Sequence, residues 1–325
     1  MDADDTDLRA AAIMAEGVGL LENGMLVGAL RCFDETIRLR ERAPWDSSPH
    51  GAWLLAGAWL NRSDVLRRLD PPDHAGAEQA LDMALERASR TVPGSDSRHV
   101  SRMALCFLNR ASLRHETGRS DEALADFGSA ENVLDQSPDR TAPSWQALKV
   151  MGGVNKALVL LDNNRVAEAH AALDACRDET DSLGEPDLTF RWHLAVCRAA
   201  GIMLDTEVGG NAPPISIETV VRAVRLASGL PIHRERIPEL LAYGALLCRR
   251  CRPVGFAGFV NECLRIPGVL DHPRHRADLA GAVLLAIRDL ELRVLHGWPG
   301  PDSGDDPVGL LRTLQYLHAR LIDFP

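Results

Sequence analysis

The chain has 325 residues, of which 46% are hydrophobic and only 5% aromatic, and its formal net charge is −10 with a pI of about 5.6. The hydrophobic fraction is ample for a buried core. Nucleic-acid binding needs a basic face that neutralises phosphates, so the acidic balance argues against direct binding of DNA or RNA.

The cysteines and the first residues indicate a cytoplasmic protein. Most of the seven cysteines lie inside helical patterns, where cysteine acts as a small apolar residue, and their spacing is not a secreted disulfide framework. The first residues, MDADDTDLRAA, are acidic and do not resemble a signal peptide. No apolar run approaches the roughly 18 residues that would cross a bilayer, so we expect no membrane segment.

The first helical pattern begins near Leu8 and ends at Asn23-Gly24, a pair typical of helix ends. A second helix carries Ala29 and Phe33, and a linker rich in Pro and Ser follows over residues 43–51. The next predicted hairpin contains the sequence Leu60-Asn61-Arg62-Ser63 and continues beyond an expanded turn at residues 70–74.

The clearest stretch runs from residue 108 to residue 134 and predicts two short amphipathic helices that meet at Gly118. Ser120 is the predicted N-cap of the second helix, and Asp121 and Glu122 follow it in the first turn, where acids complement the helix dipole. The apolar face of that helix consists of Ala123, Phe127, Ala130 and Leu134. Ala111 of the first helix is small enough to let the two helices approach closely.

The same pattern returns twice more along the chain. It reads Leu108-Asn109-Arg110-Ala111, then Val154-Asn155-Lys156-Ala157, then Val196-Cys197-Arg198-Ala199. The turn glycine is replaced by Asn163-Asn164 in the fourth hairpin, which is acceptable because asparagine tolerates a positive φ. We expect a helix from about 216 to 228, and four further helices at about 236–251, 254–266, 273–296 and 307–323.

These residues resemble the tetratricopeptide repeat (TPR), in the variant that reads Asn-Arg-Gly/Ala, then Gly, then Ala-x3-Phe-x2-Ala. The usual TPR period is about 34 residues, whereas successive motifs here are 42 to 48 residues apart because long linkers separate the hairpins. The resemblance implies an all-α, right-handed α-solenoid of about seven antiparallel helical hairpins. We expect five TPR-like hairpins over residues 1–228 and degenerate hairpins over residues 229–325 that cap the same solenoid.

Asparagine recurs at one position of the repeat, as Asn61, Asn109 and Asn155. The resemblance implies that this position faces the concave groove, where asparagines can hydrogen-bond the backbone of an extended peptide. An amide offers both a donor and an acceptor, which suits a peptide bond. The alternative is that each asparagine bonds a neighbouring helix of the same chain.

Other polar residues are expected to line the same groove. The residues that follow the asparagines, Arg62, Arg110 and Lys156, either pair with surface acids or bind a carboxylate of the ligand. Helical geometry adds several more positions near the groove: Asp64, Arg67, Arg68, His115, Glu116 and Asp162.

A metal site is a minority interpretation. Cys248 and Cys251, with Cys263, His272 and His275 downstream, offer zinc-type ligands at loose spacing. Asp302, Asp305 and Asp306 could hold a cation, although a solvated loop fits them better. We expect no bound metal and no cofactor.

The predicted function is a non-catalytic protein–protein interaction module that binds an extended peptide or partner segment. The alternative is a structural or regulatory subunit of a larger complex that uses its loops and its C-terminal half; residues 229–296 are rich in arginine, which suits an acidic partner. A metal- or thiol-dependent enzyme is the third hypothesis. The chain lacks a phosphate-binding loop, a Gly-x-Ser-x-Gly elbow and a His-Glu-x2-His motif, so we expect no enzyme.

Overall fold

The computed structural model describes residues 3–41, 48–90, 97–205, 217–251, 253–269, 271, 273–295 and 307–322. All regular secondary structure within these ranges is helical, as predicted. The chain divides into two compact units, Met1–Val159 and Leu160–Pro325. The predicted change in repeat quality at residues 228/229 stays a prediction.

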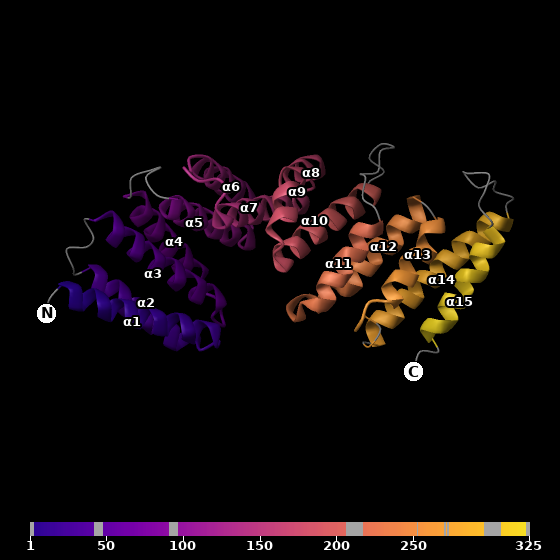
Figure 1. Ribbon diagram of the computed structural model, residues 1–325, viewed down its shortest axis with the longest axis horizontal. Coiled ribbons are helices and arrows are strands. Elements are labelled where there is room, and N and C mark those ends of the chain that lie inside the picture. Colours follow the sequence, from indigo (N-terminus) through magenta and orange to yellow (C-terminus); the bar gives the residue numbers. More distant parts are fainter. Residues whose placement is uncertain are drawn as a thin grey trace. The chain divides into compact units, whose positions relative to one another are not determined.

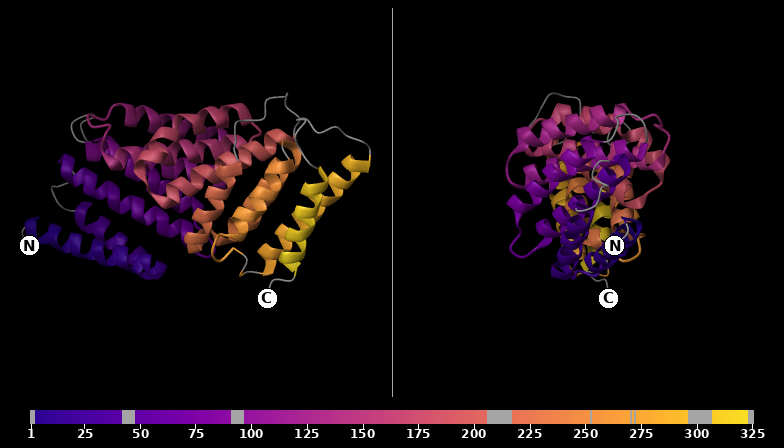
Figure 2. Two further views of the ribbon diagram at one scale, coloured as in Figure 1. Left: turned by 45° about the vertical axis from the view of Figure 1, so that its right-hand side comes forward. Right: turned by 90° about the vertical axis from the view of Figure 1, so that its left-hand side faces the viewer.

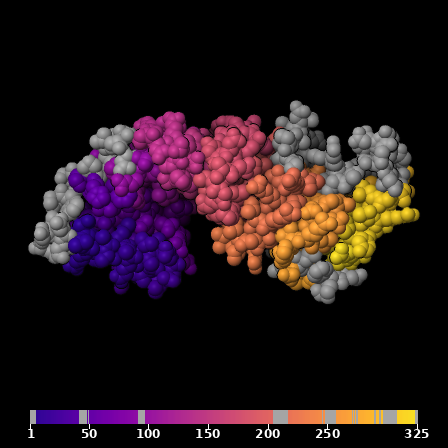
Figure 3. Space-filling model, viewed as in Figure 1, coloured from indigo at the N-terminus to yellow at the C-terminus, as the bar shows by residue number. Residues whose placement is uncertain are grey.

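The first unit is a series of helical hairpins. Its helices are α1 (Ala3–Glu22), α2 (Leu26–Glu41), α3 (Pro49–Arg68), α4 (His74–Ser89), α5 (Ser97–Glu116), α6 (Ser120–Asp135) and most of α7 (Pro143–Asp162). Each of the first three hairpins packs on itself, and the first helix of one hairpin touches the first helix of the next, so that α1 contacts α3 and α3 contacts α5. Within this unit the hairpins follow one another in chain order, as the labels of Figure 1 and the colours of Figure 3 show. This is the arrangement expected of stacked repeats.

The predicted turns are confirmed, with one correction. Gly24 and Gly118 adopt positive φ angles of 72° and 80°, and Asn164 adopts 58° in place of a glycine. The prediction that Ser120 caps α6 is wrong: the N-cap is Arg119, and no side chain caps the helix. The turn at Gly118 is one residue shorter than predicted, so Ser120 already belongs to the first helical turn with Asp121 and Glu122.

The apolar face predicted for the third hairpin is its core. Phe127 is 1% exposed and packs against Ala111, Ala123 and Ala130, with Val159 of α7 beside it. Three alanines around one phenylalanine allow close helix contact without a void. Phe33 is fully buried at the corresponding place in the first hairpin.

The second unit contains the end of α7 and the remaining helices. They are α8 (Val166–Ala175), α9 (Arg177–Leu183), α10 (Pro186–Asp205), α11 (Ile217–Gly229), the 3₁₀ helix η2 (Pro231–Arg236), α12 (Ile237–Cys251), α13 (Pro253–Leu264), α14 (Pro273–Leu295) and α15 (Pro307–Ile322). The helices predicted beyond residue 216 are confirmed to within two residues. The helices from α10 through α15 all contribute to one apolar core. The last two, α14 and α15, pair as a hairpin (Figure 2).

Two glycines in the second unit give a test of this packing. A Cβ atom at Gly244 of α12 would collide with the ring of Phe259 of α13, whereas one at Gly258 would meet nothing. Gly244→Ala is therefore expected to destabilise the fold by about 1–3 kcal/mol. Gly258 lies on the exposed side of α13. Gly258→Ala should raise the free energy of unfolding by about 0.5–1 kcal/mol, because alanine favours a helix. Urea unfolding followed by circular dichroism measures both, and shifts of the same sign would contradict the packing.

Candidate peptide-binding face

Three asparagines occupy equivalent places on the first helices of successive hairpins. Asn61 lies on α3, Asn109 on α5 and Asn155 on α7. All three are half-buried, and none makes a side-chain hydrogen bond to the part of the chain that the structure describes. The amides are thus partly shielded from water and still available to an external donor or acceptor. We refer to the sides of α3, α5 and α7 that carry them as the asparagine face.

The basic residue after each asparagine is already paired. In each case the partner is an acid on the second helix of the preceding hairpin. The pairs are Arg62–Asp34, Arg110–Asp82 and Lys156–Glu131, with N–O distances of 2.7, 2.7 and 3.0 Å. These cations connect neighbouring hairpins, and the structure thus favours the ion-pair interpretation for them over a role in holding a ligand carboxylate.

A denser cluster of charges lies between the second and third hairpins. Asp126 of α6 is 3% exposed and accepts two hydrogen bonds from Arg110, at 2.9 and 2.7 Å, and one from Arg114, at 2.9 Å. Arg114 also reaches Glu78 of α4, at 3.2 Å, and Arg119 donates two bonds to the same carboxylate, at 3.0 and 2.7 Å. The cluster connects α5 to α4 and α6 at Arg110, the residue next to Asn109.

The other predicted groove residues are spread along the same helices. Arg67 of α3 forms an ion pair with Glu116 of α5, which joins these two helices near their C-terminal ends. Asp64 lies 3.5 Å from Arg68 on α3 itself, and His115 is half-buried on α5. Asp162 belongs to the second unit, where it accepts a hydrogen bond of 3.0 Å from Arg198.

Acid should weaken the cluster through Glu78. Hydrogen bonds from Arg119, and then from Arg114, hold the pKa of Glu78 below its usual value of 4.5. A depressed pKa means that the stabilisation is present above pH 4.5 and is lost as the pH falls through the folded-state pKa. We expect Glu78→Gln to lower the free energy of unfolding by about 0.5–1 kcal/mol at pH 7. Between pH 5 and pH 3 the free energy of unfolding should fall less in this variant than in wild type. Glu86→Gln, on the exposed side of α4, is the control. An equally reduced pH dependence of stability in that variant would contradict the role given to Glu78.

The residues considered for a metal do not form a cluster where the structure describes them. Cys263 is completely buried in the apolar core, where burial raises the pKa of its thiol to about 12. The Nδ1 atom of buried His275 lies 3.1 Å from the carbonyl oxygen of Val269. The side chains of Cys248, Cys251 and His272, and residues 302–306, lie outside the described part. No group of three potential ligands occurs among the described residues.

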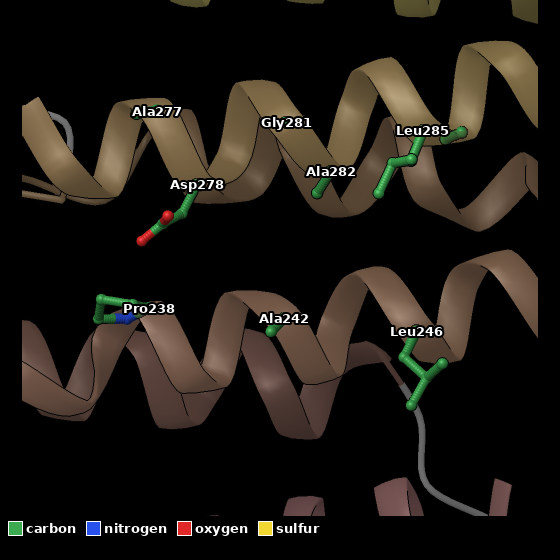
Figure 4. Close-up of a pocket in the computed structure, with 9 residues that line it drawn as sticks. Pro238, Ala242, Leu246, Ala277, Asp278, Gly281, Ala282 and Leu285 are labelled. Carbon is green, nitrogen blue, oxygen red and sulfur yellow. The ribbon is translucent and has the colours of Figure 1, made fainter. Parts of the chain in front are cut away.

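The second unit has an apolar groove of about 540 Å³ between α12 and α14. Pro238, Ala242 and Leu246 of α12 line it together with Leu285 of α14, and Asp278 points from α14 toward α12 (Figure 4). The adjoining surface of α14 exposes further leucines: Leu284, Leu292 and Leu295.

Comparison with known proteins identifies the fold. The structure superposes on the apo form of the quorum sensor NprR from B. thuringiensis with a TM-score of 0.53 and 12% identity, over 96% of this chain and 77% of that one. The fold is a divergent TPR-like array. A tetratricopeptide repeat protein from Parabacteroides merdae gives 0.44 and 14% identity, over 95% and 98% of the two chains. PilF of Pseudomonas aeruginosa gives 0.39 and 18%, over 79% and 99%.

The TPR-like assignment rests on structure because the sequence alone does not find relatives. No protein-family model matches the chain, and no curated protein matches it either. At 12% identity the similarity establishes the fold and transfers no ligand. Among the described helices, none is both long and apolar enough to cross a membrane.

Proposed function

We propose that this chain is a non-catalytic module that binds an extended peptide or partner-protein segment along its asparagine face. The supporting observation is the set of three half-buried amides on α3, α5 and α7 that have no partner within the described chain. Amides at one repeat position that are partly exposed and leave their donors and acceptors unused by the described chain can bond the backbone of a ligand.

Paired cations beside the asparagines support the same proposal. Because Arg62, Arg110 and Lys156 are paired with acids of the same chain, the asparagines beside them are better placed than these cations to bond a ligand. Amides recognise backbone irrespective of sequence, so specificity must come from neighbouring side chains. Three net hydrogen bonds provide about 1.5–4.5 kcal/mol, and side-chain contacts must supply the remainder of a useful affinity.

The cysteines are consistent with a cytoplasmic partner. Cys32, Cys106, Cys176, Cys197 and Cys263 form no disulfide. Thiols kept in this state suit a reducing compartment. Burial also raises the pKa of Cys106 and Cys197 to about 12, which makes them poor nucleophiles at neutral pH.

Affinity capture from the organism that encodes the protein tests the proposal. Wild type is compared with a variant carrying Asn61→Ala, Asn109→Ala and Asn155→Ala, after its helicity has been verified, and bound proteins are identified by mass spectrometry. We expect a partner that wild type retains and the variant loses. Equal retention by both proteins, with the fold intact, would contradict a role for the asparagine face.

The second candidate function is a subunit of a larger complex. The observation that favours it is the groove between α12 and α14, together with the exposed leucines of α14. Contiguous apolar surface of this kind is typical of protein interfaces. The capture experiment separates the two functions, because a partner held by the second unit is retained by the asparagine variant and lost in Leu285→Glu.

A further inference from the structure

A second unusual feature of the first unit is a pair of arginines near the start of α5. Arg102 is half-buried, and its guanidinium carbon lies 4.5 Å from the centre of the Trp53 ring of α3. It makes no hydrogen bond or ion pair to the described residues. Arg40 of α2 lies close enough to oppose the charge of Arg102, and burial lowers the pKa of both groups.

Arg40 adds a second positive charge, and it too has little negative charge near it. It is 6% exposed, and its Nη1 atom donates to the carbonyl oxygen of Leu54 at 3.0 Å. Its Nε atom has no hydrogen-bond partner, and the carboxylate of Asp7 lies 3.8 Å away. Asp7 is therefore a partner of Arg40 at long range, whereas Arg102 has no carboxylate partner among the described residues. Buried cations are normally paired, so two guanidinium groups with one such carboxylate between them are under-compensated within the described part of the chain.

Gly57 makes room for the guanidinium of Arg102. A Cβ atom at this position would lie 2.7 Å from the Nη1 atom of Arg102. Glycine in the middle of a helix is unfavourable compared with alanine, and Gly57 lies in the middle of α3. The helix therefore contains an unfavourable glycine at the place where the guanidinium of Arg102 packs against it.

Helical register places Arg102 beside the asparagine face. Arg102 precedes Asn109 by seven residues, which is two turns and about 10 Å along the same side of α5. Gly57 precedes Asn61 by four residues, about one turn along α3. Trp53 lies one further turn back and donates from its ring nitrogen to the carbonyl oxygen of Arg98, at 3.3 Å. A ligand on the asparagine face would pass within reach of Arg102.

We propose that Arg102, supported by Arg40, binds an oxyanion of the segment that occupies the asparagine face, either a carboxylate or a phosphate group. This inference rests on the proposed function. A guanidinium stacked on an aromatic ring keeps its N–H groups directed outward in its own plane, where they match two oxygens of one anion. A partly dehydrated site strengthens that attraction. The bound anion supplies the counter-charge that the described residues lack.

Retention of synthetic peptide pools tests this site. The probes are four immobilised pools of random heptapeptides: amidated and neutral, amidated with one glutamate, neutral with a free C-terminal carboxylate, and amidated with one phosphoserine. We expect wild type to be retained at least tenfold more by one or more of the anionic pools than by the neutral pool. The pool that is preferred identifies the source of the oxyanion. Equal retention on all four pools would overturn the inference.

Arg102→Gln is expected to abolish the preference for anionic pools while leaving retention on the neutral pool unchanged. Arg31→Gln is the matched control, because Arg31 is an exposed arginine of α2 and its replacement removes the same charge. An equal loss of preference in both variants would reduce the effect to net charge and refute the site. Loss of neutral-pool retention in the asparagine variant, without any anion preference in wild type, would refute the site and retain the proposed function.

Gly57→Ala provides a second variant that keeps every charge. Its new methyl group displaces the guanidinium of Arg102, so the anion preference should fall at least threefold although net charge is unchanged. The midpoint of thermal unfolding should stay at or above that of wild type in Arg102→Gln, because an uncompensated buried cation is removed. Two results together would show that Arg102 only stabilises the fold: a clearly lower unfolding midpoint in Arg102→Gln, and an unchanged anion preference in Gly57→Ala.

Discussion

Replacing Asn61, Asn109 and Asn155 by alanine is expected to weaken partner binding by about 10- to 1,600-fold. Each amide contributes about 0.5–1.5 kcal/mol net when it bonds a peptide group, and every 1.4 kcal/mol is a tenfold change in affinity. Isothermal titration with the captured partner, or with a peptide derived from it, measures the difference. Single substitutions should each cost a few-fold, since the three positions are on separate helices.

The stability of this variant separates a ligand-binding role from a structural one. Because the three side chains make no hydrogen bond within the described chain, their removal breaks no hydrogen bond among the described residues. Alanine is also a better helix former than asparagine, so the variant should unfold at or above the wild-type midpoint. Asn132→Ala, at an exposed position of α6, is the control for binding. Weakened binding accompanied by a lower unfolding midpoint would point instead to asparagines that support the fold.

The repeat pattern was visible in the sequence because its signals are local. Turn glycines, the Ala-x3-Phe-x2-Ala face and the asparagine positions all depend on residues within one or two helical turns. The helices beyond residue 229 could be predicted for the same reason, although the motif itself is lost there. Local signals fail at boundaries, as the cap of α6 shows: Arg119 takes the place that side-chain preference gives to Ser120.

The charge clusters could not be predicted in the same way, because their members come from different hairpins. Asp126 meets Arg110 only once α5 and α6 have paired, and Glu78 meets Arg119 across 41 residues. No short-range pattern distinguishes Asp126 from any other acid on an amphipathic helix. The reason for a glycine at position 57 likewise cannot be found in the sequence, because it depends on the guanidinium of Arg102 packing against α3. Stacking of the hairpins creates these sites, so they become visible at the tertiary level.

Asp126→Ala is expected to cause the largest loss of stability, about 3 kcal/mol. Asp126 is almost fully buried and receives three hydrogen bonds from two arginines. Removing one member of a buried charge pair leaves the partner charge without its main counterion, which typically costs 3–5 kcal/mol. The value should lie at the lower end, because Arg110 keeps Asp82 and Arg114 keeps Glu78. Urea unfolding followed by circular dichroism measures the change.

Asp82→Ala is the matched control, because it removes another carboxylate from the same arginine. The Asp82 side chain is 55% exposed and lies 2.7 Å from Arg110, so its loss should cost at most about 1 kcal/mol. Similar costs for the two variants would mean that burial does not set the strength of the cluster. If Asp126 holds Arg110 and thereby orients α5, its removal should also weaken partner binding through Asn109, at a temperature where the variant is still folded. The charge cluster would then connect the stability of the repeat stack to the geometry of the asparagine face.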